Sequence, residues 1–146
     1  MSKESEGNST GRPANLLNAQ TFFMPELPEI ALYKQYFDST ALHQTIRKVE
    51  ELDEGILQCS IGDLKKALEG AECNGSRRIG KYLFVETSGG SVLVLHFGMT
   101  GKLEYYGDRE VPEYTKVLIH FSNEYHLAYI CMRKLGKIYL TDSIES

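Results

Sequence analysis

The most informative absences in this 146-residue chain are of long apolar runs and of positive charge. No apolar run approaches the roughly 18 residues of a membrane-spanning helix, so the sequence predicts no membrane span. Lysine and arginine number 16 against 20 aspartates and glutamates, which gives a formal net charge of −4. Phosphate neutralisation needs clustered basic residues, so this balance weighs against a nucleic-acid binder. The objection is weak, because a basic stripe can lie on one face of an acidic domain.

Cysteine is also scarce, and Cys59, Cys73 and Cys131 lie far apart without a Cys-x-x-Cys pair. An odd, scattered set is typical of reduced thiols in a cytosolic protein, and it cannot alone supply a four-ligand zinc site. Residues 1–23 lack the basic start and apolar centre of a secretory signal, and their acidic residues are atypical of a mitochondrial transit peptide. We therefore expect a cytoplasmic protein.

The length suits a single domain, and 42% hydrophobic residues suffice for a core. Residues 1–23 begin rich in Ser, Gly and Asn, which predicts a disordered tail or an upstream translation artefact. The composition changes sharply at Met24. We therefore place the folded domain at residues 24–146.

Within that domain the hydrophobic pattern predicts two helices and many strands. Helical spacing predicts a helix over residues 30–42, and Ser60 as N-cap with Gly70 as stop predicts another over residues 60–70. Strands are predicted at residues 45–52, 71–78, 81–87, 91–97, 102–107, 115–122, 125–132 and 137–142. This order predicts an α+β fold, in which an antiparallel β meander forms a sandwich or flattened barrel with the helices at its edge.

The stretch "MPELPEI", residues 24–30, has two interpretations. It can be an ordinary helix start, since prolines suit the first turn and the helix dipole favours glutamates there. Alternatively, translation starts at Met24, and removal of that methionine frees the secondary amine of Pro25. An α-amino group titrates near pH ~8, so part of it is neutral and nucleophilic at physiological pH. It can attack a sugar C1′ and form an imine, with Glu26 as general acid.

Two later stretches combine glycines with cations or an exposed apolar residue. "RRIGKYLF", residues 77–84, places Arg77, Arg78 and Lys81 at a tight turn. The three cations can clamp phosphates or form an ordinary solvated cluster. "HFGMTGKL", which begins at His96, holds Met99 between two glycines, where it is either a core residue or a wedge for a base stack.

A last stretch, "MRKLGKIYL", carries the cations Arg133 and Lys134 and the apolar Leu135 just before Gly136. Taken alone, it is typical of a plain hairpin turn. Each stretch by itself is therefore weak support for a function.

Together, the order and spacing of these stretches resemble the N-terminal catalytic domain of the formamidopyrimidine-DNA glycosylase / endonuclease VIII family. The family opens with M-P-E-L-P-E and then carries R-R-x-x-K-Y-L, H-L-G-M-[ST]-G and D-P-R-[RK]-F-G motifs. Here they read "MPELPE", "RRIGKYL", "HFGMTG" and "CMRKLG". The resemblance implies a two-layer antiparallel β-sandwich flanked by helices. It also implies a monomeric, cytoplasmic and nucleoid-associated base-excision-repair enzyme.

The resemblance implies that this enzyme binds double-stranded DNA with an oxidised base or an abasic site. It cleaves the glycosidic bond and then the strand. By motif position Pro25 is the nucleophile, Glu26 protonates the deoxyribose ring oxygen, and Glu29 is a supporting acidic group. Lys81 contacts a phosphate beside the lesion, and His96 belongs to the same DNA-binding surface.

The enzyme has to extrude the damaged nucleotide, because C1′ is shielded inside the duplex. The resemblance assigns the vacated space to Met99, Arg133 and Leu135. Met99 and Leu135 supply apolar contact, and Arg133 can hydrogen-bond the orphaned base. Lys134, next to them, is a further cation for the DNA.

The chain departs from the family pattern in several respects. Leu135 replaces the usual phenylalanine, so stacking on a base is lost, and Cys131 and Met132 replace the Asp-Pro pair. The family's second half, with its helix–two-turn–helix and usually a zinc finger, has no counterpart here. We therefore expect no metal or other cofactor in this chain and little turnover from it alone. The alternative is a non-catalytic module that binds damaged DNA, its Pro25 blocked by the residues ahead of it.

Overall fold

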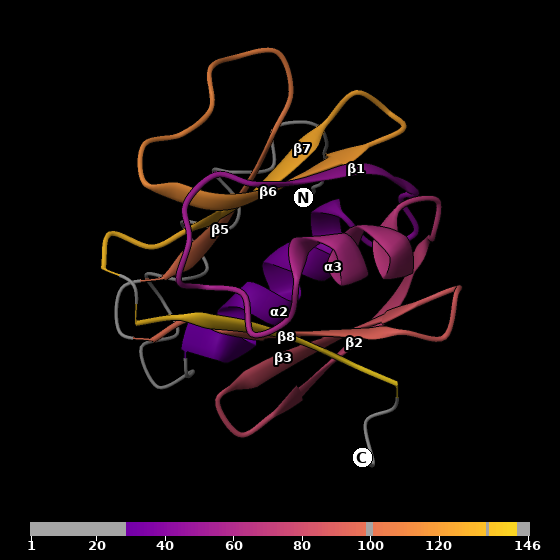
Figure 1. The fold of residues 1–146 in the computed structure, drawn as a ribbon, viewed down its shortest axis with the longest axis horizontal. Coiled ribbons are helices and arrows are strands. Elements are labelled where there is room, and N and C mark those ends of the chain that lie inside the picture. The colour runs from indigo at the N-terminus through magenta and orange to yellow at the C-terminus, as the bar shows by residue number, and fades with distance from the viewer. Residues whose placement is uncertain (1–28, 99–100, 134, 143–146) are drawn as a thin grey trace, which may run out of the picture.

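The computed structural model describes residues 29–98, 101–133 and 135–142 (Figure 1). The chain runs through α2 (Glu29–Thr40), β1 (Ile46–Glu51), α3 (Ile61–Leu68), β2 (Cys73–Ile79), β3 (Tyr82–Thr87), β4 (Val92–His96), β5 (Lys102–Tyr106), β6 (Thr115–Phe121), β7 (His126–Ile130) and β8 (Lys137–Thr141). Each element overlaps a segment that the sequence predicts as helix or strand. The local pattern therefore gives the type of every described element.

The strands form two four-stranded antiparallel sheets, ordered β1-β6-β7-β5 and β2-β3-β4-β8. The sheets lie one above the other as two layers (Figure 1). Between them lies one hydrophobic core, to which Leu83, Leu93 and Leu95 of one sheet and Val117 and Leu127 of the other contribute. Burying such a side chain is worth about 1.5–3 kcal/mol, so this contact holds the layers together. The two-layer α+β sandwich is confirmed.

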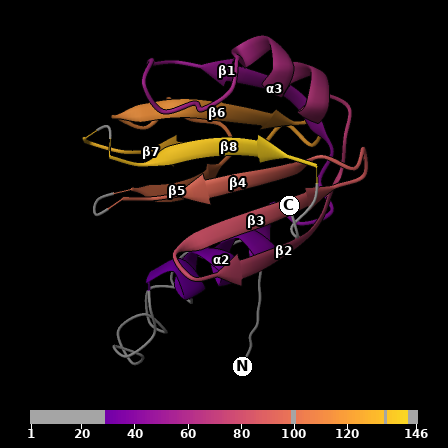
Figure 2. The ribbon, with the colours of Figure 1, turned by 60° about the horizontal axis from the view of Figure 1, so that its bottom comes forward.

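The helices flank the sandwich on two different sides (Figure 2). Helix α2 packs against β2, β3 and β5, and it buries Phe37 almost completely. Helix α3 packs against β1 through Leu64 and Leu68. Among the described residues, no helix is long and apolar enough to cross a membrane.

Helix α3 begins and ends as the sequence predicts. The Ser60 hydroxyl accepts a hydrogen bond from the Asp63 amide at 3.0 Å, and Gly70 has a φ of +92°, which favours glycine. The helix is tied to β1 because the Lys65 ammonium donates to the Val49 carbonyl at 2.7 Å and the Glu69 carboxylate accepts from the Val49 amide at 3.0 Å.

The predicted meander is wrong, because several neighbouring strands are not consecutive in sequence. Strand β5 pairs with β7, β8 returns to β4, and β1 pairs with β6. The chain crosses between the two sheets after β1, β4 and β7, so the apolar faces of the two sheets cover each other. Alternation of residues along a strand does not specify its neighbour, so the pattern missed these crossings.

Candidate functional site

Three of the motifs singled out in the sequence lie at one end of the sandwich. Strand β3 pairs with β4 and β4 with β8, so Tyr82, His96 and Lys137 form one row across the sheet. Lys81 precedes Tyr82 in the β2–β3 turn. The β4–β5 connection begins directly after His96, and the β7–β8 connection ends directly before Lys137. In Figure 2 the β2–β3 turn and the start of α2 lie at the same end of the sandwich. The fold therefore brings together segments that are far apart in sequence.

The β4–β5 and β7–β8 connections touch through their backbones. A Cβ atom placed on Gly98 would lie 2.9 Å from the Leu135 carbonyl carbon, and Gly98 also has a φ of +62°. A Cβ atom placed on Gly136 would overlap the Tyr129 hydroxyl and lie 2.8 Å from the His96 carbonyl oxygen. Contacts this short leave no room for a side chain. Both glycines are thus required for the close approach of the two turns.

Three aromatic rings stack beside these turns. The centroids of Tyr33 and Phe97 lie 4.4 Å apart, and those of Phe97 and Tyr129 lie 5.5 Å apart. The Tyr33 hydroxyl donates a hydrogen bond to the Gly101 carbonyl at 2.6 Å, and the Tyr129 hydroxyl donates one to the His96 carbonyl. Tyr33 lies in α2, so the stack ties the start of this helix to both turns.

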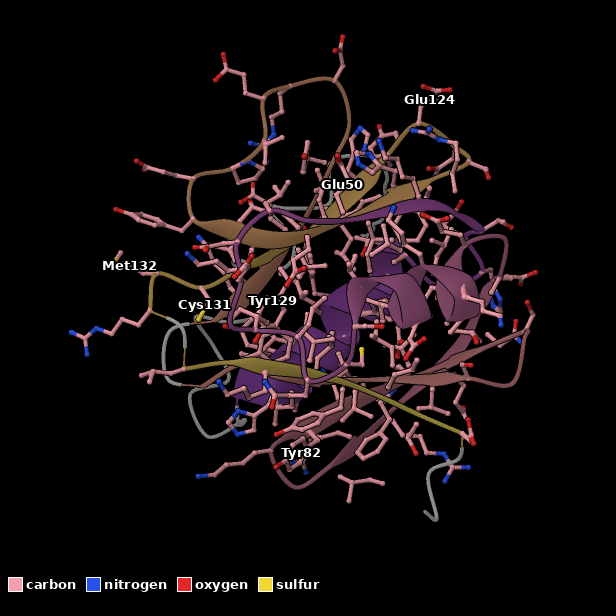
Figure 3. The ribbon with its side chains drawn as sticks, in the orientation of Figure 1. Glu50, Tyr82, Glu124, Tyr129, Cys131 and Met132 are labelled. Carbon is pink, nitrogen blue, oxygen red and sulfur yellow. The ribbon has the colours of Figure 1, made fainter. Side chains whose placement is uncertain are left out.

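Tyr129 lies inside the molecule in Figure 3. Burial raises the pKa of its hydroxyl group far above the ordinary value. The group therefore stays protonated and remains a hydrogen-bond donor across the physiological range.

The β7–β8 turn presents its predicted residues to solvent. Arg133 is exposed, and 48% of the Leu135 surface is accessible. Cys131 is buried, and its thiol hydrogen-bonds the Arg133 carbonyl. Met132 points outward from the same turn (Figure 3). Cys131 thus anchors the turn at the place where the family has an aspartate.

The β2–β3 turn carries its cations in different directions. Gly80 has a φ of +62°, and the Arg78 guanidinium donates to the Gly80 carbonyl at 3.3 Å. Consecutive residues of a strand point to opposite faces, so Arg77 and Arg78 do not share one side of β2. Lys81 is exposed at the tip of the turn. Of the three cations, Lys81 is the one that lies in the turn itself, between the end of β2 and the start of β3.

His96 is held in one orientation beside that turn. Its Nδ1 accepts a hydrogen bond from the Gly98 amide at 3.2 Å, and its ring centroid lies 5.1 Å from that of Tyr82. A neutral imidazole with Nδ1 as acceptor carries its proton on Nε2. His96 therefore offers an N–H donor to an acceptor such as a phosphate oxygen.

Several predicted residues lie outside the described part of the chain, namely Pro25, Glu26, Met99 and Lys134. Glu29 is the first residue of α2, but its side chain also lies outside the description. Across the described ranges, no three His, Cys, Asp or Glu side chains converge as metal ligands. The roles predicted for all these residues stay predictions.

The formamidopyrimidine-DNA glycosylase N-terminal domain matches residues 24–138 of this chain. The chain belongs to this glycosylase family. It is 32% identical to a formamidopyrimidine-DNA glycosylase of Moorella thermoacetica over 124 residues, 84% of this chain and 45% of the relative. It is also 32% identical to one of Synechocystis over 126 residues, 80% of this chain and 44% of the relative.

Solved structures of the family give the same fold. In a complex of the Lactococcus lactis Fpg protein with DNA containing FAPY-dG, the Fpg chain matches with a TM-score of 0.75 and 27% identity. A complex of that protein with DNA containing an abasic site gives the same values, and in both cases 81% of this chain and 44% of the other are covered. The chain spans about 45% of the length of the relatives it matches.

The family motifs did not point to Tyr33 or Tyr129 as parts of the site. Each acts through a contact with a residue distant in sequence, such as Tyr33 with Gly101 or Tyr129 with His96. A signal that could have found Tyr129 is a tyrosine at an inward-facing strand position, because a buried phenol needs a hydrogen-bond partner.

Proposed function

We propose that this chain is the catalytic N-terminal domain of a base-excision-repair DNA glycosylase with abasic-site lyase activity. Its partner is double-stranded DNA with an oxidised base or an abasic site. The observation that carries the proposal is the convergence of Lys81, His96, Arg133 and Leu135 with the start of α2 at one end of the sandwich.

The chemistry rests on Pro25, four residues before the start of α2. Its neutral amine attacks C1′ of the damaged nucleotide, and the base leaves with the electron pair of the glycosidic bond. The proton that the proline nitrogen loses passes to the departing base. Glu26 donates a proton to the ring oxygen as the sugar opens, which yields an iminium ion on the proline nitrogen. Loss of a C2′ proton then drives elimination of the 3′ phosphate.

The described turns would hold the DNA during this chemistry. The Lys81 ammonium and the His96 Nε2–H can contact phosphate oxygens beside the lesion. Leu135 can enter the space left by the extruded nucleotide, and the Arg133 guanidinium can hydrogen-bond the base left unpaired. The exposure of Arg133 and Leu135 on a turn braced by two backbone contacts supports these roles.

Borohydride trapping tests the proposal. The protein is expressed from Met24 to the natural end of its reading frame and mixed with abasic-site duplex under borohydride, which reduces the iminium to a stable amine. We expect a covalent adduct that is absent with undamaged duplex. Absence of any adduct from folded protein would contradict the proposal.

A second candidate function follows from the 23 residues that precede Met24 in the sequence. While they remain attached, the nitrogen of Pro25 is a tertiary amide without a usable lone pair. The domain would then bind damaged DNA without cleaving it. Mass spectrometry of the native N-terminus separates the two functions: a chain beginning at Pro25 supports the enzyme, and one beginning at Met1 or Ser2 supports the binding module.

A further inference from the structure

A pair of histidines and a glutamate lie together on the outer face of the β1-β6-β7-β5 sheet. His120 on β6 and His126 on β7 are direct cross-strand partners, and their Nδ1 atoms lie 2.8 Å apart. The other ring nitrogen of His120, Nε2, lies 2.7 Å from a carboxylate oxygen of Glu50 on β1. Figure 3 shows Glu50 on this sheet, on the opposite side of the sandwich from Tyr82.

The cluster is separate from the candidate DNA-binding end. His120 and His126 flank the β6–β7 hairpin, whereas the β7–β8 turn with Arg133 and Leu135 lies at the other end of β7. Figure 1 shows the hairpin and the β7–β8 connection on opposite sides of the molecule. The function proposed above therefore makes no use of these histidines.

The hydrogen bonds define which nitrogen lone pairs are available. The Glu50 carboxylate accepts from His120 Nε2–H, and this bond is the main cause that lowers the pKa of Glu50. One proton at most then lies between the two Nδ1 atoms, because they are too close for two. Once that proton leaves, each Nδ1 atom has a lone pair for a cation that lies beside the line joining the two nitrogens.

We propose that His120 and His126 chelate a divalent late transition-metal ion through their Nδ1 atoms, with Glu50 orienting His120 from behind. A carboxylate that accepts the second N–H of a ligating histidine is a common supporting contact at metal sites. When the ion binds, the shared proton moves to Nε2 of His126, and both rings remain neutral ligands. The remaining coordination positions belong to water, since Glu50 contacts the far nitrogen of His120 and no three His, Cys, Asp or Glu side chains of the described residues form a metal-binding group.

The spacing of the two nitrogens selects the coordination geometry. With metal–nitrogen bonds of about 2.1 Å, nitrogens 2.8 Å apart subtend roughly 85° at the metal. That angle is close to the ~90° of square-planar and octahedral sites, which suit Cu²⁺ and Ni²⁺, and far from the tetrahedral angle that Zn²⁺ prefers.

Both positive and negative side chains surround the histidine pair, so some of them oppose the binding of a cation and others favour it. Arg47 raises the positive potential at His126, and the Lys48 ammonium lies 3.6 Å from Glu50. Glu50 and Glu124 supply negative charge on the same side. The centroid of the Tyr106 ring lies 5.1 Å from that of His126. The Arg109 guanidinium lies over the Tyr106 ring, 4.9 Å from its centroid. Tyr106 therefore flanks the pair on one side, and 14% of the His120 side chain is exposed to solvent.

Calorimetric titration of the 146-residue chain with Ni²⁺ alone tests the site, and it needs no DNA. We expect one ion per chain, loss of binding in His120→Ala and His126→Ala, and a 10- to 100-fold weakening, roughly, in Glu50→Gln. His43→Ala is the matched control, since His43 is an exposed histidine that also faces a carboxylate, Glu72, at 3.5 Å. It should bind Ni²⁺ like the parent chain.

A spectroscopic measurement on the unmutated chain covers the case in which a variant fails to fold. The electron paramagnetic resonance spectrum of the Cu²⁺ complex should show two imidazole nitrogens bound to the metal. Absence of Ni²⁺ binding, binding that survives both histidine substitutions, unchanged affinity in Glu50→Gln, or a Cu²⁺ spectrum with fewer than two nitrogens would each overturn the proposal.

Discussion

The hydroxyl group of Tyr129, on β7, donates a hydrogen bond to the main-chain carbonyl of His96 at the end of β4. These strands belong to different sheets. The bond therefore joins the two layers where the chain crosses between them. The same hydroxyl sits where any side chain at position 136 would have to lie. One phenol thus links the motif that begins at His96 to the turn that carries Arg133 and Leu135.

Replacing Tyr129 by phenylalanine should lower the free energy of unfolding by about 1–3 kcal/mol, because the His96 carbonyl loses a buried partner. Urea denaturation followed by circular dichroism measures the change. Tyr125→Phe is the control, since 45% of the Tyr125 surface is exposed, and its loss should stay within about 0.5 kcal/mol. Equal losses in the two variants would show that the Tyr129–His96 bond contributes nothing.

Replacing Gly136 by alanine should cost at least about 1–3 kcal/mol, because the new methyl group overlaps the Tyr129 hydroxyl. In the double variant Gly136→Ala/Tyr129→Phe the overlap is smaller. The double variant should therefore lose less unfolding free energy than the sum of the losses of the two single variants. Gly89→Ala is the control, because its nearest neighbour would be 3.8 Å away. Strict additivity of the two losses would rule out the contact.

The Glu69–Val49 contact predicts an acid-dependent loss of stability. The hydrogen bond from the Val49 amide, followed by that from Lys65, lowers the pKa of Glu69 in the folded chain. The native state thus binds fewer protons than the unfolded one, so this stabilisation is complete above the unfolded value of about 4.3. It is lost as the pH falls through the folded pKa.

Unfolding free energies measured from pH 6 down to pH 3, roughly, check this expectation. Glu69→Gln should flatten the decline on the acid side, whereas Glu113→Gln, in an exposed loop, should follow the parent chain. Parallel curves for Glu69→Gln and the parent would contradict the assignment.

Lys81→Ala should weaken binding to abasic-site duplex and reduce the slope of log K against log salt by about 1, as expected for one lost phosphate contact. Fluorescence anisotropy at several salt concentrations gives both quantities. Lys66→Ala removes an exposed lysine from α3, away from the β2–β3 turn, and should leave the slope unchanged. Equal slopes for Lys81→Ala and the parent would show that Lys81 makes no phosphate contact.

The sequence predicts local features of this fold well and its long-range pairings poorly. The Ser60 cap and the Gly70 stop of α3 depend on neighbours within a few residues, so their residue types suffice to predict them. The pairing of β5 with β7 depends on residues about 25 positions apart, and alternation along each strand is compatible with several neighbours.

The same division holds in the candidate site. Lys81, His96 and Arg133 stand out because they lie in short motifs. The contacts that hold the turn after His96, Tyr33 with Gly101 and Tyr129 with His96, become visible only when the sheets are assembled. These contacts depend on how the two sheets pack against each other, and a short sequence motif does not predict that packing.

In the proposed reaction the nitrogen of Pro25 is the nucleophile. Peptide mapping by mass spectrometry of the borohydride-reduced adduct with abasic-site duplex tests it most directly, because the reduced sugar remnant stays on the residue that formed the iminium. We predict the remnant on Pro25 at the N-terminus of the mature chain. A remnant on Lys81, or on any other lysine, would contradict the account.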